Sequence, residues 1–307
     1  MPELPEVETV VRDLRPLLTG RKIVGVRKSK QKLRHAWKPE WDAAVTGAKV
    51  TGLRRRGKWI LVDLDTPNPT GGGPKGDHTV LVVHLGMTGQ FTAVPATESE
   101  PDHLHLVFEL DRGKQLRFRD PRRFGSVEYH PSAADADYGL DAFLGWEPFD
   151  IDPEEFRQSL ALTRQNLKAV LLNQAFVAGV GNIYADEALF RARLHPARPG
   201  SSLTADECDR LREAIAAVMT RAIETRGSTI RDYIGGSGLR GGFQNEHAVY
   251  GRTGEPCPVC RGVVACVRLA GRSSHYCGAC QPLPRAAKAP KGRKSVAQGV
   301  SPGKAKK

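Results

Sequence analysis

Two pairs of cysteines near the C-terminus limit the folds open to this chain most strongly. Cys257 and Cys260 form one C-x2-C pair, and Cys277 and Cys280 form a second pair sixteen residues further on. Two such pairs at this separation are typical of a tetrahedral zinc site held by two hairpin turns. Because four thiolates fill the coordination sphere, the sequence predicts one structural Zn²⁺ with no open position for a substrate.

The segment between the two cysteine pairs contains a turn with a single arginine. Residues 271–274 read Gly-Arg-Ser-Ser, a composition typical of a hairpin tip. Arg272 at such a tip could bind a phosphate, although most loop arginines are only solvated. Cys208 and Cys266 have no partner at a metal-binding spacing, so we expect both to be buried cysteines without a metal role.

The N-terminus, which reads MPELPE, is a second unusual feature. A proline after Met1 leads us to expect removal of the methionine, which leaves a free secondary amine on Pro2. An α-amino group has a pKa of about 7.7–8.0, so a real fraction is unprotonated near pH 7. Pro2 is therefore a candidate nucleophile for a carbonyl or aldehyde carbon, and Glu3 is a candidate proton shuttle. The alternative is that Pro2 and Pro5 only stiffen the start of a helix.

The charge of the chain is unevenly distributed. The net charge is +12, and residues 285–307 contain eight Lys and Arg with no acidic residue, which leaves +4 for residues 1–284. This asymmetry favours a polyanionic partner, nucleic acid before membrane. No apolar run approaches the roughly 20 residues of a membrane span, and the acidic N-terminus lacks a signal-peptide pattern. We therefore expect a cytoplasmic protein whose cysteines do not form disulfides.

The apolar pattern divides the chain into helical and β regions. Apolar residues at helical spacing predict a helix from Pro5 to about Leu18, which would attach the terminus to a core. Seven short segments rich in Val, Ile and Leu then suggest a sandwich or barrel without intervening helices: 22–26, 49–54, 59–64, 79–85, 103–109, 115–119 and 126–129. After a linker at about 131–150, helices are expected at 153–162, 166–174, 182–191, 204–225 and 229–234. Residues 67–77 look like a hairpin insertion, and the tail 285–307 is expected to be disordered.

Several turns carry residues that suit contact with nucleic acid. The loop 120–125 reads DPRRFG, where arginines could bind phosphate and Phe124 could wedge into a base step. Met87, between two glycines in HLGMTG, would be a second wedge if exposed and core filler if buried. The charged turn RRRGK at 54–58 is usually only solvated, but on a DNA-binding face it would contact phosphates. The turn Gly179–Gly181, with Asn182 as N-cap, resembles an anion site at a helix start, although many helix starts bind nothing.

Together these stretches resemble the formamidopyrimidine-DNA glycosylase family. The resemblance spans about residues 1–283 and rests on motifs in a shared order: PELPEVE at 2–8, RRGKW at 55–59, HLGMTG at 84–89, DPRRFG at 120–125, GVGNIYADE at 179–187, VYGRTGEPC at 249–257 and the zinc ribbon. The implied fold is α+β, with an N-terminal helix on a two-sheet β-sandwich, then a helix-two-turn-helix bundle and a C-terminal zinc ribbon. The implied domains are the sandwich at 1–135, a linker at 136–150, the bundle at 151–245, the ribbon at 246–283 and a basic tail at 284–307.

The resemblance also implies a chemistry for the residues already singled out. Such enzymes act in base-excision repair, where they excise an oxidised purine from damaged double-stranded DNA and then cut the abasic strand. The amine of Pro2 would form a Schiff base with the sugar, Glu3 would move protons, and Lys58 and Arg272 would assist β- and δ-elimination. By the same resemblance Met87, Arg122 and Phe124 fill the gap left by the flipped nucleotide, and the other expected DNA contacts are His84, His103, Lys168 and Asn182.

The resemblance further favours one branch of the family. Leu4 stands where the oxidised-pyrimidine branch tends to have glycine, and the wedge residues are complete, so we favour 8-oxoguanine and formamidopyrimidines as substrates. The chain departs from the pattern at Pro101, where relatives often have a second histidine before His103. We expect a monomer associated with the nucleoid, with zinc as its metal and no small-molecule cofactor. The basic tail is a candidate tether that would raise non-specific DNA affinity.

Overall fold

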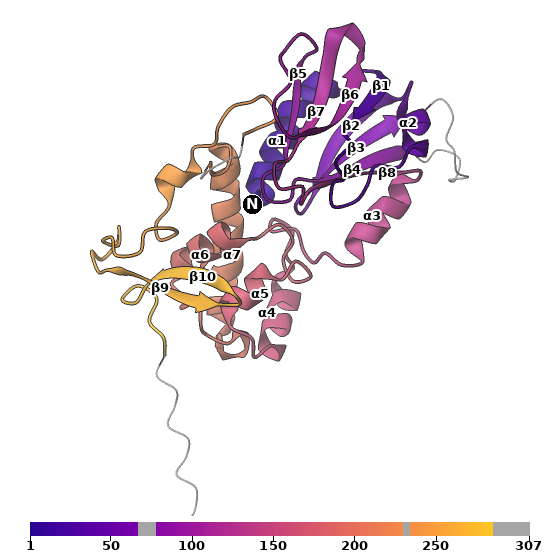
Figure 1. The fold of residues 1–307 in the computed structure, drawn as a ribbon. Helices are drawn as coiled ribbons and strands as arrows, with labels where there is room; N and C mark the ends of the chain where they lie inside the picture. The colour runs from indigo at the N-terminus through magenta and orange to yellow at the C-terminus, as the bar shows by residue number, and fades with distance from the viewer. Residues whose placement is uncertain (67–77, 230–233, 285–307) are drawn as a thin grey trace, which may run out of the picture.

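The computed structural model describes residues 1–66, 78–229 and 234–284, which form two lobes (Figure 1). The upper lobe in Figure 1 is a β-sandwich, and the lower lobe contains helices and a two-stranded ribbon. The insertion expected at 67–77, most of the helix expected at 229–234 and the tail at 285–307 lie outside the described residues.

Helix α1 (Leu4–Leu18) lies at the junction of the two lobes and confirms the predicted helix. Its buried apolar residues Val7, Val10 and Leu14 belong to the core of the sandwich. Leu4, one turn earlier, belongs instead to the core of the helical lobe. The first helix is therefore anchored in both lobes, and the residues just before it are held where the lobes meet.

The sandwich consists of two antiparallel four-stranded sheets among the described residues. One has the order β2 (Lys49–Arg56), β3 (Trp59–Asp65), β4 (Thr79–His84), β8 (Ser126–His130). The other has the order β1 (Ile23–Lys28), β6 (Leu104–Leu110), β7 (Lys114–Arg119), β5 (Gln90–Pro95). The seven predicted strands are present, and β5 is an addition. Only Phe91 of β5 is fully buried, so its sequence lacks the alternation that marks a strand.

Two helices interrupt regions in which no helix was predicted. Helix α2 (Glu40–Val45) is a short helix between β1 and β2, so the prediction of strands without intervening helices is wrong. Helix α3 (Ala133–Asp141) lies inside the predicted linker. Ser132 caps it by accepting a hydrogen bond from Asp135 N, and Ala136 and Leu140 pack against the outer face of a sheet. With two buried positions, its apolar stripe is too narrow to stand out in the sequence.

The helical lobe contains α4 (Pro153–Leu162), α5 (Leu167–Leu172), α6 (Asn182–Arg191) and α7 (Ala205–Glu224), in agreement with the predicted helices within two residues at each end. Side-chain caps at Asp152, Asn166 and Thr204 begin three of them. The prediction of Asn182 as the N-cap of α6 is wrong, because Gly181 is the N-cap and Asn182 is the first helical residue. Three short 3-10 turns complete the described elements: η1 (Asp111–Gly113), η2 (Gly200–Ser202) and η3 (Phe243–Glu246).

The C-terminal ribbon pairs β9 (Val264–Leu269) with β10 (Arg272–Cys277). Its register pairs Arg272 with Leu269, which places Arg272 beside the tip of the hairpin, as predicted. Cys208 is buried in α7, as predicted, but Cys266 is exposed on β9, so that part of the prediction is wrong. Within the described ranges, no helix is both long and apolar enough to cross a bilayer.

Candidate active site

The N-terminal residues are held against the loop that precedes α6. Pro2 and Glu3 are buried, whereas Met1 is 52% exposed. Leu4 N donates to Gly179 O at 3.1 Å, and Ile183 N donates to Glu3 Oε1 at 3.0 Å. The carboxylate of Glu3 therefore lies at the N-terminal end of α6, where the positive end of the helix favours a negative charge.

Two glycines allow this close approach. A Cβ at Gly179, whose φ is +86°, would lie 2.6 Å from Leu4 Cβ. A Cβ at Gly181 would lie well under 3.0 Å from the carboxyl carbon of Glu3. The sequence suggested an anion site at this helix start, and the group that lies there is the chain's own Glu3.

Lys58 projects from the turn between β2 and β3 toward the same loop. Its Nζ donates to Val180 O at 3.0 Å, and the residue is buried. Burial lowers the pKa of the Lys58 ammonium; Arg272 acts in the same direction, and Glu3 and Glu6 oppose it. An amine with a lowered pKa can accept and release protons more readily near neutral pH.

A second buried carboxylate, Glu6, was not among the sequence candidates. It accepts hydrogen bonds from Glu3 N at 2.7 Å and Ser228 N at 2.7 Å, and the hydroxyl of Tyr184 also donates to it. Burial and the nearby charge of Glu3 raise the pKa of Glu6 to about 7. The PELPE motif contained both glutamates, but nothing local indicated that Glu6 would face Tyr184 and Ser228 from distant parts of the chain.

Lys168 lies behind the start of α6 and is fully buried. Its Nζ donates to Asn182 O at 2.9 Å and pairs with Asp186 Oδ1 at 2.5 Å. Burial lowers the pKa of Lys168, and Asp186 opposes that shift. Asn182 Oδ1 is buried without a hydrogen-bond partner among the described residues. In this arrangement both residues organise the helix start.

Asp186 also connects this region to the ribbon. Its Oδ2 accepts hydrogen bonds from His275 N and from His275 Nδ1, each at 2.9 Å. Arg272, on the same strand as His275, is exposed, and its charge contributes to lowering the pKa of both Lys58 and Lys168. The charge of Arg272 on the ribbon therefore acts on Lys58 at the N-terminal site, although the two residues are more than two hundred positions apart in the sequence.

The two predicted wedge loops are joined by one buried carboxylate. Asp120 accepts hydrogen bonds from Thr88 Oγ1 at 2.5 Å and from Gly125 N at 2.8 Å. On the surface of these loops Met87 is 37% exposed and Phe124 47% exposed. The guanidinium carbon of Arg122 lies 4.7 Å from the centroid of the Phe124 ring. Met87 is therefore not core filler, and the three predicted wedge residues share one exposed surface.

The two predicted histidine contacts differ in their surroundings. His84 ends β4 with its ring centroid 4.7 Å from that of Trp59, and Gly86 N donates to its Nδ1 at 3.1 Å. Burial lowers the pKa of His84 to about 4, helped by Lys58 and Arg34, so the ring is neutral at pH 7 and its Nε2 carries the proton. His103 is exposed, with φ at 63°.

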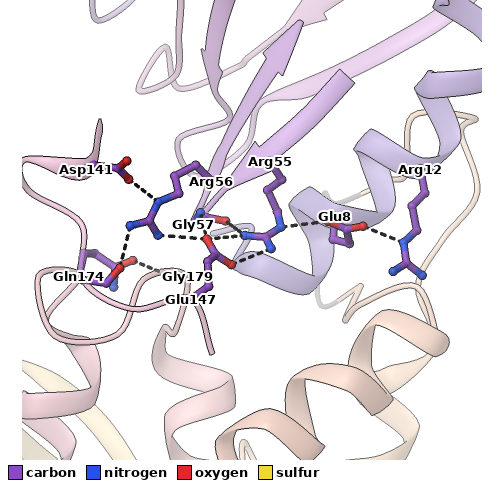
Figure 2. A network of polar contacts seen from close by, with 10 residues as sticks. Glu8, Arg12, Arg55, Arg56, Gly57, Asp141, Glu147, Gln174 and Gly179 are labelled. Carbon is purple, nitrogen blue, oxygen red and sulfur yellow. Dashed lines mark hydrogen bonds and ion pairs between the residues drawn. The ribbon is translucent and has the colours of Figure 1, made fainter. Parts of the chain in front are cut away.

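Two of the arginines before Lys58, Arg55 and Arg56, form ion pairs within the protein. Figure 2 shows Arg55 and Arg56 pointing toward Glu147, which lies at the end of the predicted linker. Arg55 also pairs with Glu8, and Arg56 pairs with Asp141. The sequence carried no local signal for this network, because its carboxylates lie up to 92 residues away from the arginines.

The four cysteines fit one zinc ion. Their Sγ atoms all lie within 4.8 Å of one another, with Cys257 and Cys280 at 3.8 Å and Cys260 and Cys277 at 3.4 Å. Zinc–sulfur bonds of about 2.3 Å in a tetrahedron place the sulfurs about 3.8 Å apart. The donor set and the spacing therefore suit a four-coordinate structural zinc.

Comparisons with known proteins agree along the chain. Residues 1–127 match the family described as formamidopyrimidine-DNA glycosylase N-terminal domain, residues 144–233 its H2TH domain, and residues 254–283 the zinc finger found in FPG and IleRS. A formamidopyrimidine-DNA glycosylase of Laribacter hongkongensis is 43% identical over 92% of this chain and 100% of its own length. One from Symbiobacterium thermophilum is 43% identical over 92% of this chain and 90% of its own length.

Solved structures match equally well. A Lactococcus lactis FPG mutant in complex with DNA containing Fapy-dG has a TM-score of 0.82 and 32% identity, covering 92% of this chain and all of that one. The Lactococcus lactis Fpg bound to DNA with an abasic site has a TM-score of 0.81 at 32% identity and the same coverage. The matched zinc finger and the four converging cysteines assign one structural zinc to the ribbon. The chain is a member of the formamidopyrimidine-DNA glycosylase family.

Proposed function

We propose that the chain removes oxidised purines, 8-oxoguanine and formamidopyrimidines, from duplex DNA and then cleaves the abasic strand by β,δ-elimination. The observation that carries the proposal is the position of Pro2 next to Glu3, at the junction where Lys58 and the charge of Arg272 also converge. The DNA in the matched complexes, which contains Fapy-dG or an abasic site, supports the same substrate class.

The chemistry begins with the amine of Pro2. Removal of Met1, which is exposed, converts the amide nitrogen of Pro2 into a secondary amine. This amine attacks C1′ of the damaged nucleotide, and the C1′–base bond breaks with its electron pair leaving on the base, which takes up a proton. Opening of the sugar ring then leaves an iminium ion between Pro2 N and C1′. Glu3, held against the end of α6, protonates the ring oxygen in this step.

Strand cleavage uses the iminium ion as an electron sink. Loss of a proton from C2′ expels the 3′ phosphate, and a second elimination expels the 5′ phosphate. Lys58, which is buried with its Nζ 3.0 Å from Val180 O, is proposed to assist elimination and to hold a phosphate. Arg272 on the ribbon supplies a positive charge for the departing phosphate.

The exposed wedge surface serves extrusion of the damaged nucleotide. The reacting carbon is inaccessible inside a duplex, so the nucleotide has to leave the stack. Met87 and Phe124 can enter the gap, while Arg122 can contact the orphaned base. His84 and His103 flank this region and are proposed as further DNA contacts. Asn182 and Lys168 are proposed as DNA contacts because they match family positions near the DNA backbone.

The experiment that tests the proposal is borohydride trapping on duplex DNA containing 8-oxoguanine. We expect a covalent complex with the mature protein and its loss in Pro2→Gly, with mass spectrometry confirming the absence of Met1 in both. An unchanged trap in Pro2→Gly would move the nucleophile elsewhere, with Lys58 as the next candidate. Faster excision of thymine glycol than of 8-oxoguanine would contradict the proposed lesion class.

Two coarser features of the proposal can be tested at the same time. We propose that the protein acts as a monomer; sedimentation at a dimer mass with and without DNA would contradict this. We also propose a location at the nucleoid, where its substrate lies. A fluorescent fusion that fails to overlap a DNA stain would argue against that location.

A further inference from the structure

Glu147 binds the turn that carries Lys58. Its Oε1 accepts a hydrogen bond from Gly57 N at 2.7 Å, and its two oxygens accept from the Arg55 guanidinium at 3.1 and 2.7 Å. The Arg56 guanidinium donates to Oε1 at 3.2 Å. Figure 2 shows this carboxylate between the two arginines, directly below Gly57. One side chain therefore holds three consecutive residues that immediately precede Lys58.

The segment that carries Glu147 is itself fixed to the helical lobe. Gly145 N donates to Gln174 O at 2.9 Å, and Ala178 N donates to Trp146 O at 2.8 Å. The ring of Trp146 also packs edge-on against Phe176, with centroids 5.5 Å apart. Glu147 is therefore attached to the helical lobe through its neighbours, and its side chain binds the turn between β2 and β3 of the sandwich.

The acceptor of Lys58 belongs to the same fixed segment. Val180 O accepts from Lys58 Nζ at 3.0 Å and from Gln174 Nε2 at 2.8 Å, and Gly179 N donates to Gln174 Oε1 at 3.0 Å. Gln174 thus connects the loop at 179–180, which binds Lys58, to the segment at 145–147, which carries Glu147. One connected set of hydrogen bonds in the helical lobe therefore holds both the turn between β2 and β3 and the tip of the Lys58 side chain.

Charge makes the carboxylate necessary to this arrangement. Two guanidinium groups and the Lys58 ammonium lie on consecutive or neighbouring residues, and the Arg55 side chain is only 9% exposed. Glu8 offsets part of the charge of Arg55 and Asp141 part of that of Arg56, but Glu147 alone contacts both arginines and the backbone among the described residues. Loss of its charge would leave the mostly buried guanidinium of Arg55 with Glu8 as its remaining carboxylate partner among the described residues.

We propose that Glu147 is a positioning residue that holds Lys58 against Val180 and thereby sets its place in the elimination steps. The catalytic part of this inference rests on the proposed function; the structural part does not. A displacement of about 1 Å in a catalytic group can lower a rate on the order of a hundredfold, so loosening the turn is expected to affect the rate of strand cleavage more than DNA affinity.

The test compares Glu147→Gln with Glu207→Gln. The Arg198–Glu207 pair is a close match, with 9% and 19% of the two side chains exposed against 9% and 18% for Arg55 and Glu147, and it lies in the helical lobe at the start of α7. Acetic anhydride labelling, read by peptide mass spectrometry, reports access to Lys58, with the fully buried Lys168 as an internal reference. Single-turnover cleavage of a duplex with a preformed abasic site reports function.

We expect Glu147→Gln to speed labelling of Lys58 relative to Lys168 and to slow strand cleavage tenfold or more, with binding to a tetrahydrofuran-containing duplex changed by less. Glu147→Asp should restore part of the cleavage rate. Glu207→Gln should alter neither the labelling nor the cleavage rate, even if it lowers the melting temperature as much as Glu147→Gln does. Unchanged Lys58 labelling in Glu147→Gln would overturn the inference. Faster labelling with an unchanged cleavage rate would overturn its catalytic part. If the wild-type protein neither traps nor cleaves DNA, the proposed function fails, while the labelling still decides whether Glu147 holds Lys58.

Discussion

Gly181 is a residue at which one added methyl group would disturb the site. Its φ of −133° is open to any residue, so backbone conformation does not require glycine there. The requirement comes from Glu3, whose carboxyl carbon occupies the space that a Cβ would need. The absence of a side chain at Gly181 therefore allows the carboxylate of Glu3, 178 residues earlier in the chain, to lie there.

We expect Gly181→Ala to lower the single-turnover rate of base excision on 8-oxoguanine DNA tenfold or more, because Glu3 has to move away from the end of α6. Gly139→Ala is the matched control, since a Cβ there meets nothing within 4 Å and the residue lies within helix α3. That control should retain activity and gain up to about 1 kcal/mol in stability from helix propensity. Equal rates for wild type and Gly181→Ala would show that the position of Glu3 does not matter to excision.

Glu6 makes the fold itself sensitive to pH. Its pKa in the fold is raised from 4.5 to about 7, so between these values the folded state holds a proton that the unfolded state has released. Stability from this group is therefore fully present below pH 4.5 and is lost as pH rises toward about 7. The shift corresponds to a loss on the order of 3 kcal/mol.

We therefore expect the wild type to lose unfolding free energy relative to Glu6→Gln as the pH is raised from 5 to 8. Urea denaturation of both proteins at each pH measures this difference. Glu8→Gln is the control: although burial raises the pKa of Glu8, its bonds to Arg12 and Arg55 lower it below 4.5, so the contribution of Glu8 is lost only as pH falls below 4.5 and is constant between pH 5 and 8. A pH-independent difference between Glu6→Gln and wild type would mean that Glu6 is ionised in the fold at pH 5.

The ribbon depends on partners outside itself. Its core is small: Cys257, Val264 and Cys277 pack with Val249 and with Phe190 of α6. Asp186 of α6 fixes β10 through His275. A two-stranded hairpin is marginally stable alone, so the placement of Arg272 relies on zinc and on α6 together.

Cys260→Ser should lower zinc content and strand cleavage together, because a three-thiolate site binds the ion more weakly and releases the hairpin. Cys266→Ser is the control, since this cysteine is also exposed on the ribbon but lies outside the cluster. Zinc content measured by mass spectrometry and the nicking rate should stay at wild-type levels in that control. Full activity of a zinc-free Cys260→Ser protein would show that the placement of Arg272 does not depend on the metal.

On the scale of the whole molecule, the two lobes are joined by α1, which contributes to both cores, and by the Glu147 network. The N-terminus lies at the junction so formed (Figure 1). The charge that would attract DNA is distributed differently: of the net +12, eight positive charges lie in residues 285–307, outside the described structure.

Truncation after residue 284 should therefore weaken non-specific DNA binding and reduce its salt dependence, without changing the cleavage rate of bound DNA. The slope of log affinity against log salt becomes shallower by about 0.9 for each phosphate that the protein no longer neutralises. Binding to undamaged duplex at 50 and 200 mM salt measures that slope, and single-turnover cleavage is the internal control. An unchanged slope would show that the tail does not neutralise phosphates.

Local sequence was enough for most of the elements and for part of the site. Helix α1, seven strands and the main helices carry strong apolar patterns, and the cysteine spacing predicted the metal site, because each depends on residues close together in the chain. Strand β5 and helix α3 were missed because few of their residues are buried. Family resemblance, rather than local pattern, supplied the proposed roles of Lys58 and Arg272 in elimination.

The sequence by itself determined which chemical groups are available: a proline behind Met1, a neighbouring carboxylate, two apolar side chains in glycine-containing turns and four cysteine thiols. The tertiary structure alone decided which carboxylate faces which cation. It buried Glu6 against Tyr184, paired Lys168 with Asp186, and set Glu147 beneath Arg55 and Arg56. The physical reason is that pKa values and ion pairs depend on burial and on distances between atoms, which residues far apart in the chain acquire only when both lobes are folded together.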